Sequence, residues 1–313
     1  MPRPAPDSGL PHCADNAACC RRLSCRPPHA FDAVKALVLR YDLHCHSTRS
    51  DGLLVPAELV RRAAARGVDV LALTDHDDTA GLVEAQDAAS EAGIELVCGS
   101  ELSVSWEDLT VHVVALHIDP DHTGFLEGLA TIRHGREGRA RRIASALEAA
   151  GIADAWDGAM RYVTSERLIS RAHFARFLVD TGYARDMKDV FRRYLAPGLP
   201  GYVEHAWATL GDAIGWIHAA GGQAVLAHPG RYKVNSAGMQ RLLEDFKGHG
   251  GDAIEVLSPS HTAAQATQFA SLTRVYGLKA SMGSDFHGPG EGRFDLGELP
   301  GLPTGLTPVW SGW

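Results

Sequence analysis

Imidazole and carboxylate side chains that could bind a divalent metal stand close together early in this sequence. His44 and His46 follow the apolar run 36–39, and Asp51 lies a few residues later, before a glycine. Because residues i and i+2 of a strand share a face, the two imidazoles are predicted to point the same way. Two imidazole nitrogens and a carboxylate oxygen are a typical ligand set for zinc or manganese. An isolated His-x-His pattern is nevertheless weak evidence for a metal site.

The same arrangement recurs where other apolar runs end. His76 follows the run 68–73, and Glu101 follows the run that begins at residue 94. In a β/α barrel the catalytic side chains come from the ends of several strands at one face. Nine groups are therefore predicted to share one site: His44, His46, Asp51, His76, Glu101, His112, His228, Asp285 and His287.

Nine groups exceed what one metal can use. A single Zn²⁺ or Mn²⁺ takes about four to six ligands, so the number favours two or three ions, with Glu101 or Asp285 as a bridge. Clustered ions suit phosphoester cleavage, because a metal-bound hydroxide would attack phosphorus while another ion stabilises the charge on the phosphoryl oxygens. The residues alone thus favour a metal-dependent phosphoesterase.

Alternating strands and helices must position these groups. Strands are predicted over 36–43, 68–73, 94–97, 111–117, 223–227, 253–257 and 278–282, and helices over 56–66, 79–92, 210–220, 239–248 and 262–276. Runs this short fit either structure by periodicity, so the intervening helices and the β-branched content decide. Seven strands joined by helices predict an α/β fold with a closed or nearly closed parallel barrel.

Two segments fall outside the alternation. Helical periodicity over 128–150, 168–181 and 187–195 predicts a helical insertion, taken as 121–200, that forms a lid or side wall. Residues 1–37 lack periodicity and are predicted to be a disordered N-terminal extension. The barrel then comprises 38–120 and 201–313.

Composition excludes several classes of partner. The 313 residues carry a formal net charge of −8, which argues against a broad basic surface for long duplex nucleic acid but leaves room for a short phosphorylated substrate. No apolar stretch approaches the roughly 20 residues that cross a bilayer, so no membrane is expected as a partner. Cys45 and Cys98 fall in predicted strands and are expected to be buried, which suits a reducing compartment such as the cytoplasm.

Six motifs resemble those of the PHP (polymerase and histidinol phosphatase) metallophosphoesterases, in order from about residue 40 to 288. They are Asp42-Leu43-His44-Cys45-His46-Ser47, Thr74-Asp75-His76-Asp77, Gly99-Ser100-Glu101, His112, Ala227-His228-Pro229-Gly230 and Gly283-Ser284-Asp285-Phe286-His287. The Ser170-Arg171-Ala172-His173-Phe174-Ala175 segment of the insertion is similar to the branch with 3',5'-nucleoside bisphosphate phosphatases and a 5'-3' exoribonuclease.

This resemblance implies a distorted (β/α)7, TIM-like barrel with a trinuclear Mn²⁺ site; Zn²⁺, Fe²⁺ and Mg²⁺ are alternatives. It implies removal of a phosphate from nucleoside bisphosphates, trimming of short 5'-phosphorylated RNA, or both. One metal would be held by His44, His46, Glu101 and Asp285, a second by Asp51, His76 and His287, and a third by Glu101, His112 and His228. Arg171 and His173 would bind a substrate phosphate and, with His228, take part in catalysis.

Several alternatives remain open at this level. The chain could be another barrel metal hydrolase, such as an amidohydrolase-like enzyme, or a non-catalytic metal-binding scaffold. Asp75 and Asp77 are interpreted as groups that orient His76. Glu255 and His261 have both a structural and a site explanation. The arginines of the first insertion helix, from Arg133 to Arg142, are interpreted as a solvated face, with phosphate steering as the minor alternative.

Overall fold

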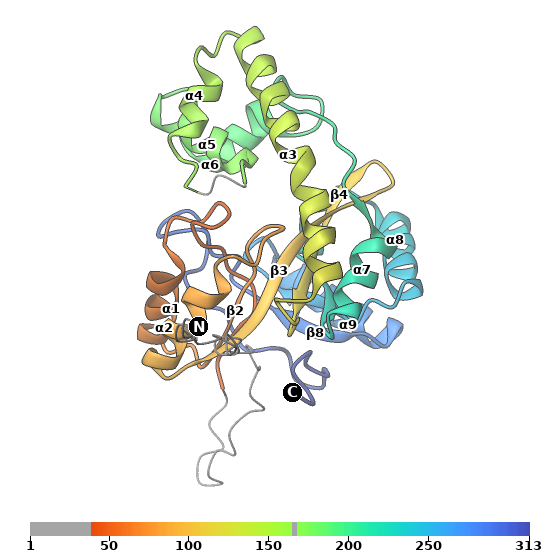
Figure 1. Ribbon diagram of the computed structural model, residues 1–313. Helices are drawn as coiled ribbons and strands as arrows, with labels where there is room; N and C mark the ends of the chain where they lie inside the picture. The colour runs from red at the N-terminus through yellow and green to blue at the C-terminus, as the bar shows by residue number, and fades with distance from the viewer. Residues whose placement is uncertain (1–38, 165–167) are drawn as a thin grey trace, which may run out of the picture.

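The computed structural model describes residues 39–164 and 168–313. The predicted N-terminal extension, 1–37, lies outside these residues, as does the beginning of the first predicted strand. Within them the expected α/β barrel is confirmed: a strongly curved sheet carries helices on its outer face (Figure 1).

The described part of the chain contains eight strands. They are β1 (Tyr41–Asp42), β2 (Val70–Leu73), β3 (Glu95–Trp106), β4 (Leu109–Leu116), β5 (Ala208–Thr209), β6 (Gln223–Leu226), β7 (Ala253–Leu257) and β8 (Lys279–Met282). Their order is β1-β2-β3-β4-β6-β7-β8, and the short β5, which the sequence did not indicate, pairs with β3. The barrel closes just beyond β1 and β8, where Leu43 N donates to Met282 O (3.1 Å) and His46 N donates to Phe286 O (2.9 Å).

The prediction of an all-parallel barrel is wrong at β4, which runs antiparallel to both β3 and β6. Only Glu107 and Asp108 separate β3 from β4, and Glu107 adopts a φ of 46°, as a tight hairpin turn requires. Because β4 runs in the opposite direction, its beginning lies at the edge where the other strands end. His112 therefore reaches that edge from the start of its strand.

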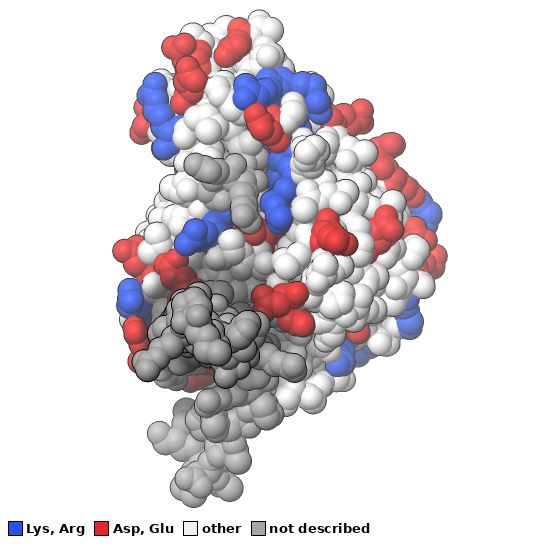
Figure 2. Space-filling model, in the orientation of Figure 1, with Lys and Arg blue, Asp and Glu red and all other residues white. Residues whose placement is uncertain are grey.

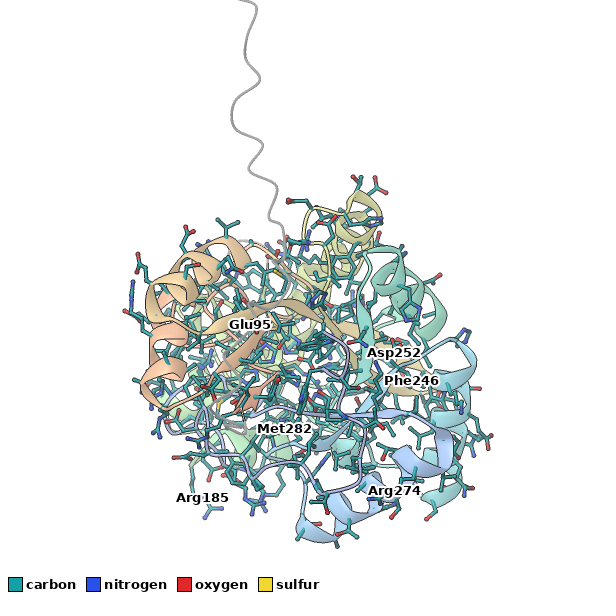
Figure 3. All side chains as sticks on the ribbon, turned by 90° about the horizontal axis from the view of Figure 1, so that it is seen from below. Glu95, Arg185, Phe246, Asp252, Arg274 and Met282 are labelled. Carbon is teal, nitrogen blue, oxygen red and sulfur yellow. The ribbon has the colours of Figure 1, made fainter. Side chains whose placement is uncertain are left out.

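Helices cover the sheet on two sides. Seen from below, α1 (Pro56–Ala65) and α2 (Leu82–Ala92) lie on one side, and α7 (Leu210–Ala219), α8 (Ser236–Gly248) and α9 (Ala263–Tyr276) lie on the other (Figure 3). All five were predicted within a few residues. Among these described helices, and those of the insertion, none combines the length and apolarity needed to cross a membrane.

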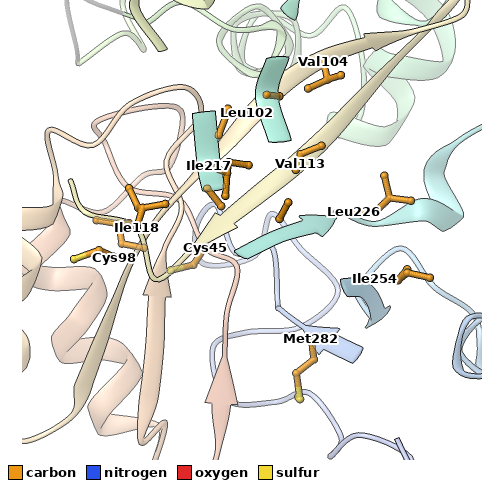
Figure 4. Close-up of a cluster of buried hydrophobic side chains, with 14 of the residues drawn as sticks. Cys45, Cys98, Leu102, Val104, Val113, Ile118, Ile217, Leu226, Ile254 and Met282 are labelled. Carbon is orange, nitrogen blue, oxygen red and sulfur yellow. The ribbon is translucent and has the colours of Figure 1, made fainter. Parts of the chain in front are cut away.

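The strands alternate their side chains between two cores, as a period of two residues requires. On β2, Leu71 and Leu73 belong to the core on the helix side of the sheet, whereas Val70 and Ala72 belong to the core inside the barrel. Figure 4 shows other members of the core on the helix side, such as Leu102 and Val113. The same alternation on β3 and β4 places Glu101 and His112 on the inner side. The barrel thus presents its polar inner positions at one end, above an apolar interior.

The C-terminal segment fills that interior. Val309 is fully buried among the inward side chains, and its N–H donates to Ala280 O (2.8 Å). The Trp310 ring stacks on Tyr41, with ring centroids 4.0 Å apart.

The region between β4 and β5 is helical. It contains α3 (Thr123–Ala149), α4 (Ala155–Met160), α5 (Arg171–Asp180), α6 (Met187–Val190) and the π-helix η1 (Phe191–Leu195); the short α4 was not predicted. The long α3 rises from the barrel to the other helices (Figure 1), and its first turns join the barrel core while its last turns join a separate insertion core. The prediction that the arginines of α3 form a solvated face is wrong for Arg136 and Arg139, because these residues are only 6% and 7% exposed. The exact domain boundaries stay a prediction.

Candidate metal centre

The structure brings the nine predicted ligand residues together at one end of the barrel. Each follows or occupies a strand, and the reversed β4 supplies His112. The backbone is specialised here: of six non-glycine residues with positive φ among those described, His228 and Asp285 are predicted ligands and Asp77 follows another. Such conformations cost about 1–3 kcal/mol each and cluster at functional sites. Gly283 is required next to them, because a Cβ atom there would lie 2.1 Å from the Cβ of His44.

Glu101 is the centre of the cluster. Its Oε2 lies 3.2 Å from His44 Nε2, 3.3 Å from His46 Nε2 and 3.1 Å from His76 Nδ1. Its Oε1 lies 2.8 Å from His112 Nδ1 and 2.9 Å from His228 Nε2. A carboxylate whose two oxygens face different imidazoles has the geometry of a bridging ligand.

Two other carboxylates complete the cluster. Asp285 Oδ1 lies 3.5 Å from His44 Nε2 and 3.3 Å from His46 Nε2. Asp51 Oδ1 lies 3.3 Å from His287 Nε2, and Asp51 Oδ2 lies 3.8 Å from His76 Nε2. The aspartates thus flank the histidines around Glu101.

The ligand atoms form three groups, and the atoms of each group lie within 4.8 Å of one another. The groups are His44, His46, Glu101 and Asp285; His46, Asp51, His76 and His287; and His76, Glu101 and His112. The first group equals one predicted ligand set. The second adds His46 to another set, and in the third His76 stands where His228 was expected. The assignment of residues to individual ions stays a prediction.

The pKa values of the cluster reflect its concentrated charges. Burial would lower the pKa of His44 and His46, but Glu101 and the other carboxylates around them raise it, so a bound metal would displace a proton from each imidazole. Burial would raise the pKa of Glu101, but His112, His44 and His76 hold it well below its usual range. Burial would also raise the pKa of Asp285, and Arg231 and His44 hold it well below. Burial and Arg231 lower the pKa of His228 to about 4, so its imidazole is neutral and able to bind a metal near neutral pH. The carboxylates are ionised and ready to bind a cation.

Buried polar atoms without a hydrogen-bond partner also indicate a site for a cation. Among the described residues, four buried side-chain atoms lack a hydrogen-bond partner, and three of them, Asp51 Oδ1, His76 Nδ1 and His228 Nδ1, belong to predicted ligands. Native proteins leave few such atoms unsatisfied, and an ion is one accepted explanation. The donor set therefore fits divalent metals such as manganese or zinc.

Glu255, left open by the sequence, supports the site from behind. Its Oε1 accepts from His44 Nδ1 (2.6 Å), and its Oε2 accepts from the backbone N–H of His228 (2.5 Å). A carboxylate on the far nitrogen fixes the tautomer and orientation of a metal-binding imidazole. His261 has a structural role, because its Nε2 accepts from Gly230 N (3.1 Å) in the loop after His228.

The interpretation of Asp75 and Asp77 is wrong, because neither carboxylate contacts His76. Asp75 accepts hydrogen bonds from Ser47 and Ser50. Asp77 accepts from Ser103 N (2.7 Å) and Arg136 Nε (2.8 Å). Asp75 thus fixes the loop that carries His46, and Asp77 ties the site to α3.

The proposed phosphate-binding pair lies at the beginning of α5, beside the cluster. Ser170 caps this helix and its Oγ donates to Asp51 Oδ2 (2.8 Å). His173 is buried, and its Nδ1 accepts from Ser170 N (3.0 Å) in the capping box. The guanidinium carbon of Arg171 lies 5.6 Å from the centre of the Phe191 ring.

Positive charge collects around Arg171. The guanidinium groups of Arg136 and Arg139 lie 4.9 Å and 5.3 Å from the centre of the Trp207 ring. Burial, Arg171 and Arg136 lower the pKa of Arg139 to about 9, and burial lowers the pKa of Arg171. Among the described residues, neither Arg139 nor Arg171 forms an ion pair with a carboxylate. A bound anion would relieve this repulsion.

The sequence analysis missed Arg231, whose Nη2 donates to Asp285 Oδ2. It follows the His228-Pro229-Gly230 motif directly, so its place in the loop could have suggested it. It also missed Ser170, whose capping role is visible in the sequence but whose contact with Asp51 is not.

Comparisons with known proteins agree with this architecture. The family model of the PHP domain matches residues 42–198. A 3',5'-nucleoside bisphosphate phosphatase of Chromobacterium violaceum is 54% identical over 269 residues, which are 86% of this chain and 94% of that protein. The 5'-3' exoribonuclease Rnm of Salmonella typhimurium is 46% identical over 275 residues, which are 87% of this chain and 93% of that protein.

Solved structures show the same fold. A Chromobacterium violaceum protein titled an amidohydrolase, with bound sulfate and no metal, superposes with a TM-score of 0.84 at 52% identity over 87% of this chain and 95% of that one. A Bifidobacterium adolescentis protein described as a metal-dependent phosphoesterase gives a TM-score of 0.74 at 29% identity over 87% of this chain and 93% of that one.

Proposed function

This chain belongs to the PHP domain family and is a phosphoesterase, and from that premise we propose that it acts on 3',5'-nucleoside bisphosphates and on short 5'-phosphorylated RNA. The observation that carries the proposal is the cluster around Glu101, beside Arg139 and Arg171, which form no ion pair with a carboxylate of the described residues. It can bind divalent metals and a phosphorylated substrate side by side. The proposed location is the cytoplasm, where such substrates occur.

We propose three Mn²⁺ ions as the metal complement, held by the nine clustered residues. When bound, the metals supply an activated water and neutralise charge on the phosphoryl group. The residues of the chain position the ligands. The carboxylate of Glu101 contacts five imidazoles, and Glu255 accepts hydrogen bonds from His44 and from the backbone N–H of His228. Their burial keeps the geometry fixed, so little reorganisation is needed during reaction.

The arginines supply the second phosphate site. Guanidinium groups bind phosphate through paired N–H donors, and Arg139 and Arg171 are not engaged by carboxylates within the described chain. We propose that Arg171, with His173 at the same helix end, holds the 5'-phosphate. A phosphate bound there would sit beside Asp51, at the edge of the cluster.

One geometry serves both proposed reactions. Removing the 3'-phosphate of a bisphosphate and releasing the first nucleotide of a 5'-phosphorylated strand both break the bond between phosphorus and the 3' oxygen. Water attacks phosphorus, and the 3' oxygen leaves and takes up a proton. The two substrates differ only in what else the phosphorus carries. In the bisphosphate the 3'-phosphate is terminal, whereas in RNA it is esterified to the next nucleotide.

The other classes are less well supported. One structural neighbour is titled an amidohydrolase, yet it holds sulfate, a tetrahedral anion that resembles phosphate. A non-catalytic scaffold would be expected to lack ligands, whereas all nine positions carry groups that can bind metal. Both observations favour the phosphoesterase.

A paired assay tests the proposal. We expect the manganese-loaded protein to release phosphate from adenosine 3',5'-bisphosphate and 5'-mononucleotides from a 5'-phosphorylated RNA oligonucleotide, and excess EDTA to abolish both. Phosphate release and chromatography of the products measure the two reactions. Failure on both substrates with metal bound would refute the proposed function.

Arg171→Ala is expected to raise KM for adenosine 3',5'-bisphosphate about tenfold, the scale of one lost charge-assisted hydrogen bond. KM for adenosine 3'-monophosphate should change much less, because that substrate lacks the phosphate which Arg171 is proposed to hold. The exposed Arg142→Ala on α3 is the matched control. An equal effect on both substrates would mean that Arg171 has only a structural role.

A further inference from the structure

An open groove lies along α3, apart from the metal cluster. It is a groove of about 870 Å³ between one face of α3 and the residues around Trp156 and Ile169. Arg133, Glu137 and Arg141 line it at intervals of four residues, which places them on one side of the helix. Figure 2 shows Lys and Arg side chains in a column over α3 on this face.

Arginines line the groove of a protein whose overall charge is negative. Arg133, Arg136 and Arg141 line it, and Glu137 is the one carboxylate among the described residues of its lining, although the whole chain has a formal net charge of −8. Arg136 is paired with the buried Asp77, and Arg133 Nη1 lies 3.8 Å from Asp78 Oδ1, so Arg141 carries the most accessible positive charge. Glu137 Oε1 accepts from Arg141 Nη2 (2.7 Å), but the two side chains are 66% and 60% exposed. An exposed pair of this kind contributes only about 0.3–0.5 kcal/mol, so a phosphate can take the place of the glutamate.

The groove also offers a surface for stacking. The guanidinium carbon of Arg141 lies 4.3 Å from the centre of the half-buried Trp156 ring. Aromatic rings and guanidinium planes are the surfaces on which unpaired bases stack, and they accept any base. The groove therefore combines the two features that bind single strands without regard to sequence.

Both walls of the groove lead to the metal cluster. On one wall, Arg136 Nε donates to Asp77 Oδ2 (2.8 Å), next to His76. On the other wall, Ile169 precedes Ser170, whose Oγ donates to Asp51 Oδ2 (2.8 Å). A strand whose first phosphodiester lies at the cluster can thus continue into the groove.

We propose that this groove holds the nucleotides that follow the first one of an RNA strand, and so favours strands over nucleoside bisphosphates. The proposal rests on the proposed function, because it places the scissile phosphodiester at the metal cluster. It assigns Trp156 to base stacking and Arg141 to a phosphate of the strand.

Binding measured without hydrolysis tests the groove directly. In EDTA, the fluorescence anisotropy of a labelled, 5'-phosphorylated RNA hexamer gives Kd for the full-length protein and its variants. Trp156→Ala and Arg141→Ala should each raise this Kd about tenfold, the scale of one lost stacking or phosphate contact. Arg141→Ala should also reduce the slope of log Kd against log salt by about 0.7. Kd for adenosine 3',5'-bisphosphate, from competition, should rise far less.

Three controls separate the outcomes. Arg185→Ala removes an 81% exposed arginine outside the groove and should leave both Kd values unchanged. Trp156→Phe keeps a ring and should restore binding if stacking matters, while thermal melting checks that Trp156→Ala is folded. A glutamate hexapeptide shows whether negative charge alone suffices.

Equal weakening of both nucleic-acid ligands, no weakening of either, or tight binding of the peptide would overturn the groove assignment. The proposed function fails separately, if the wild-type protein with manganese hydrolyses neither substrate. Binding in EDTA does not depend on that result.

Discussion

Replacing Glu101 with glutamine is expected to lower kcat/KM for adenosine 3',5'-bisphosphate by at least about a thousandfold, which is about 4 kcal/mol of transition-state stabilisation. The reason is that its two oxygens face five imidazoles, from His44 to His228. Glutamine removes the negative charge and turns an NH₂ group toward nitrogen atoms that must accept a metal. Steady-state kinetics and the manganese content of the dialysed protein measure the effect.

Glu95→Gln is the matched control, because Glu95 is an exposed glutamate at the beginning of the same strand. It should retain activity and metal. If Glu101→Gln kept full manganese content and activity within about tenfold of the wild type, the cluster around Glu101 would not be the catalytic metal site.

Arg136→Ala is expected to lower the free energy of unfolding by about 3 kcal/mol, the lower end of the cost of leaving a buried charge without its partner. Asp77 is completely buried and accepts hydrogen bonds from Arg136 and from Ser103. The substitution removes the guanidinium and leaves the carboxylate buried, with only the serine to compensate. Urea unfolding measured by tryptophan fluorescence gives the change.

Two further variants define the cause. Arg142→Ala, on the exposed side of the same helix, should change the free energy of unfolding by less than about 0.5 kcal/mol. The double substitution Asp77→Asn with Arg136→Met removes both charges and should recover part of the loss. A double variant as unstable as Arg136→Ala would show that packing, and not the unpaired carboxylate, determines the effect.

The elements, and the place where the predicted ligand residues meet, were largely predictable because their patterns are local. A buried strand is an apolar run a few residues long, and the group that follows it, such as His76, is placed by the direction of the strand. The reversal of β4 was not predictable from that pattern, because an apolar run reads the same in a parallel and an antiparallel strand. His112 was included in the predicted site for its residue type and its place near the beginning of a predicted strand, and the structure places it beside Glu101.

Contacts between distant segments escaped the sequence analysis. Asp77 lies beside His76 in sequence, which suggested a supporting role there, but its side chain pairs with Arg136, 59 residues away. The true support of His44 is Glu255, 211 residues away. Nothing in the arginine spacing of α3 showed that Arg136 and Arg139 are buried, because burial depends on where the barrel and Trp207 lie.

The filling of the barrel interior by Val309 has a consequence for biosynthesis. The residues that line this interior begin at Leu43, so nearly the whole lining is synthesised before Val309 is added. A nascent chain on the ribosome therefore holds an unfilled apolar interior until its last strand and the segment after it have emerged. During that interval exposed apolar surface makes a partly made chain prone to aggregation, and this is the stage at which a chaperone would protect it.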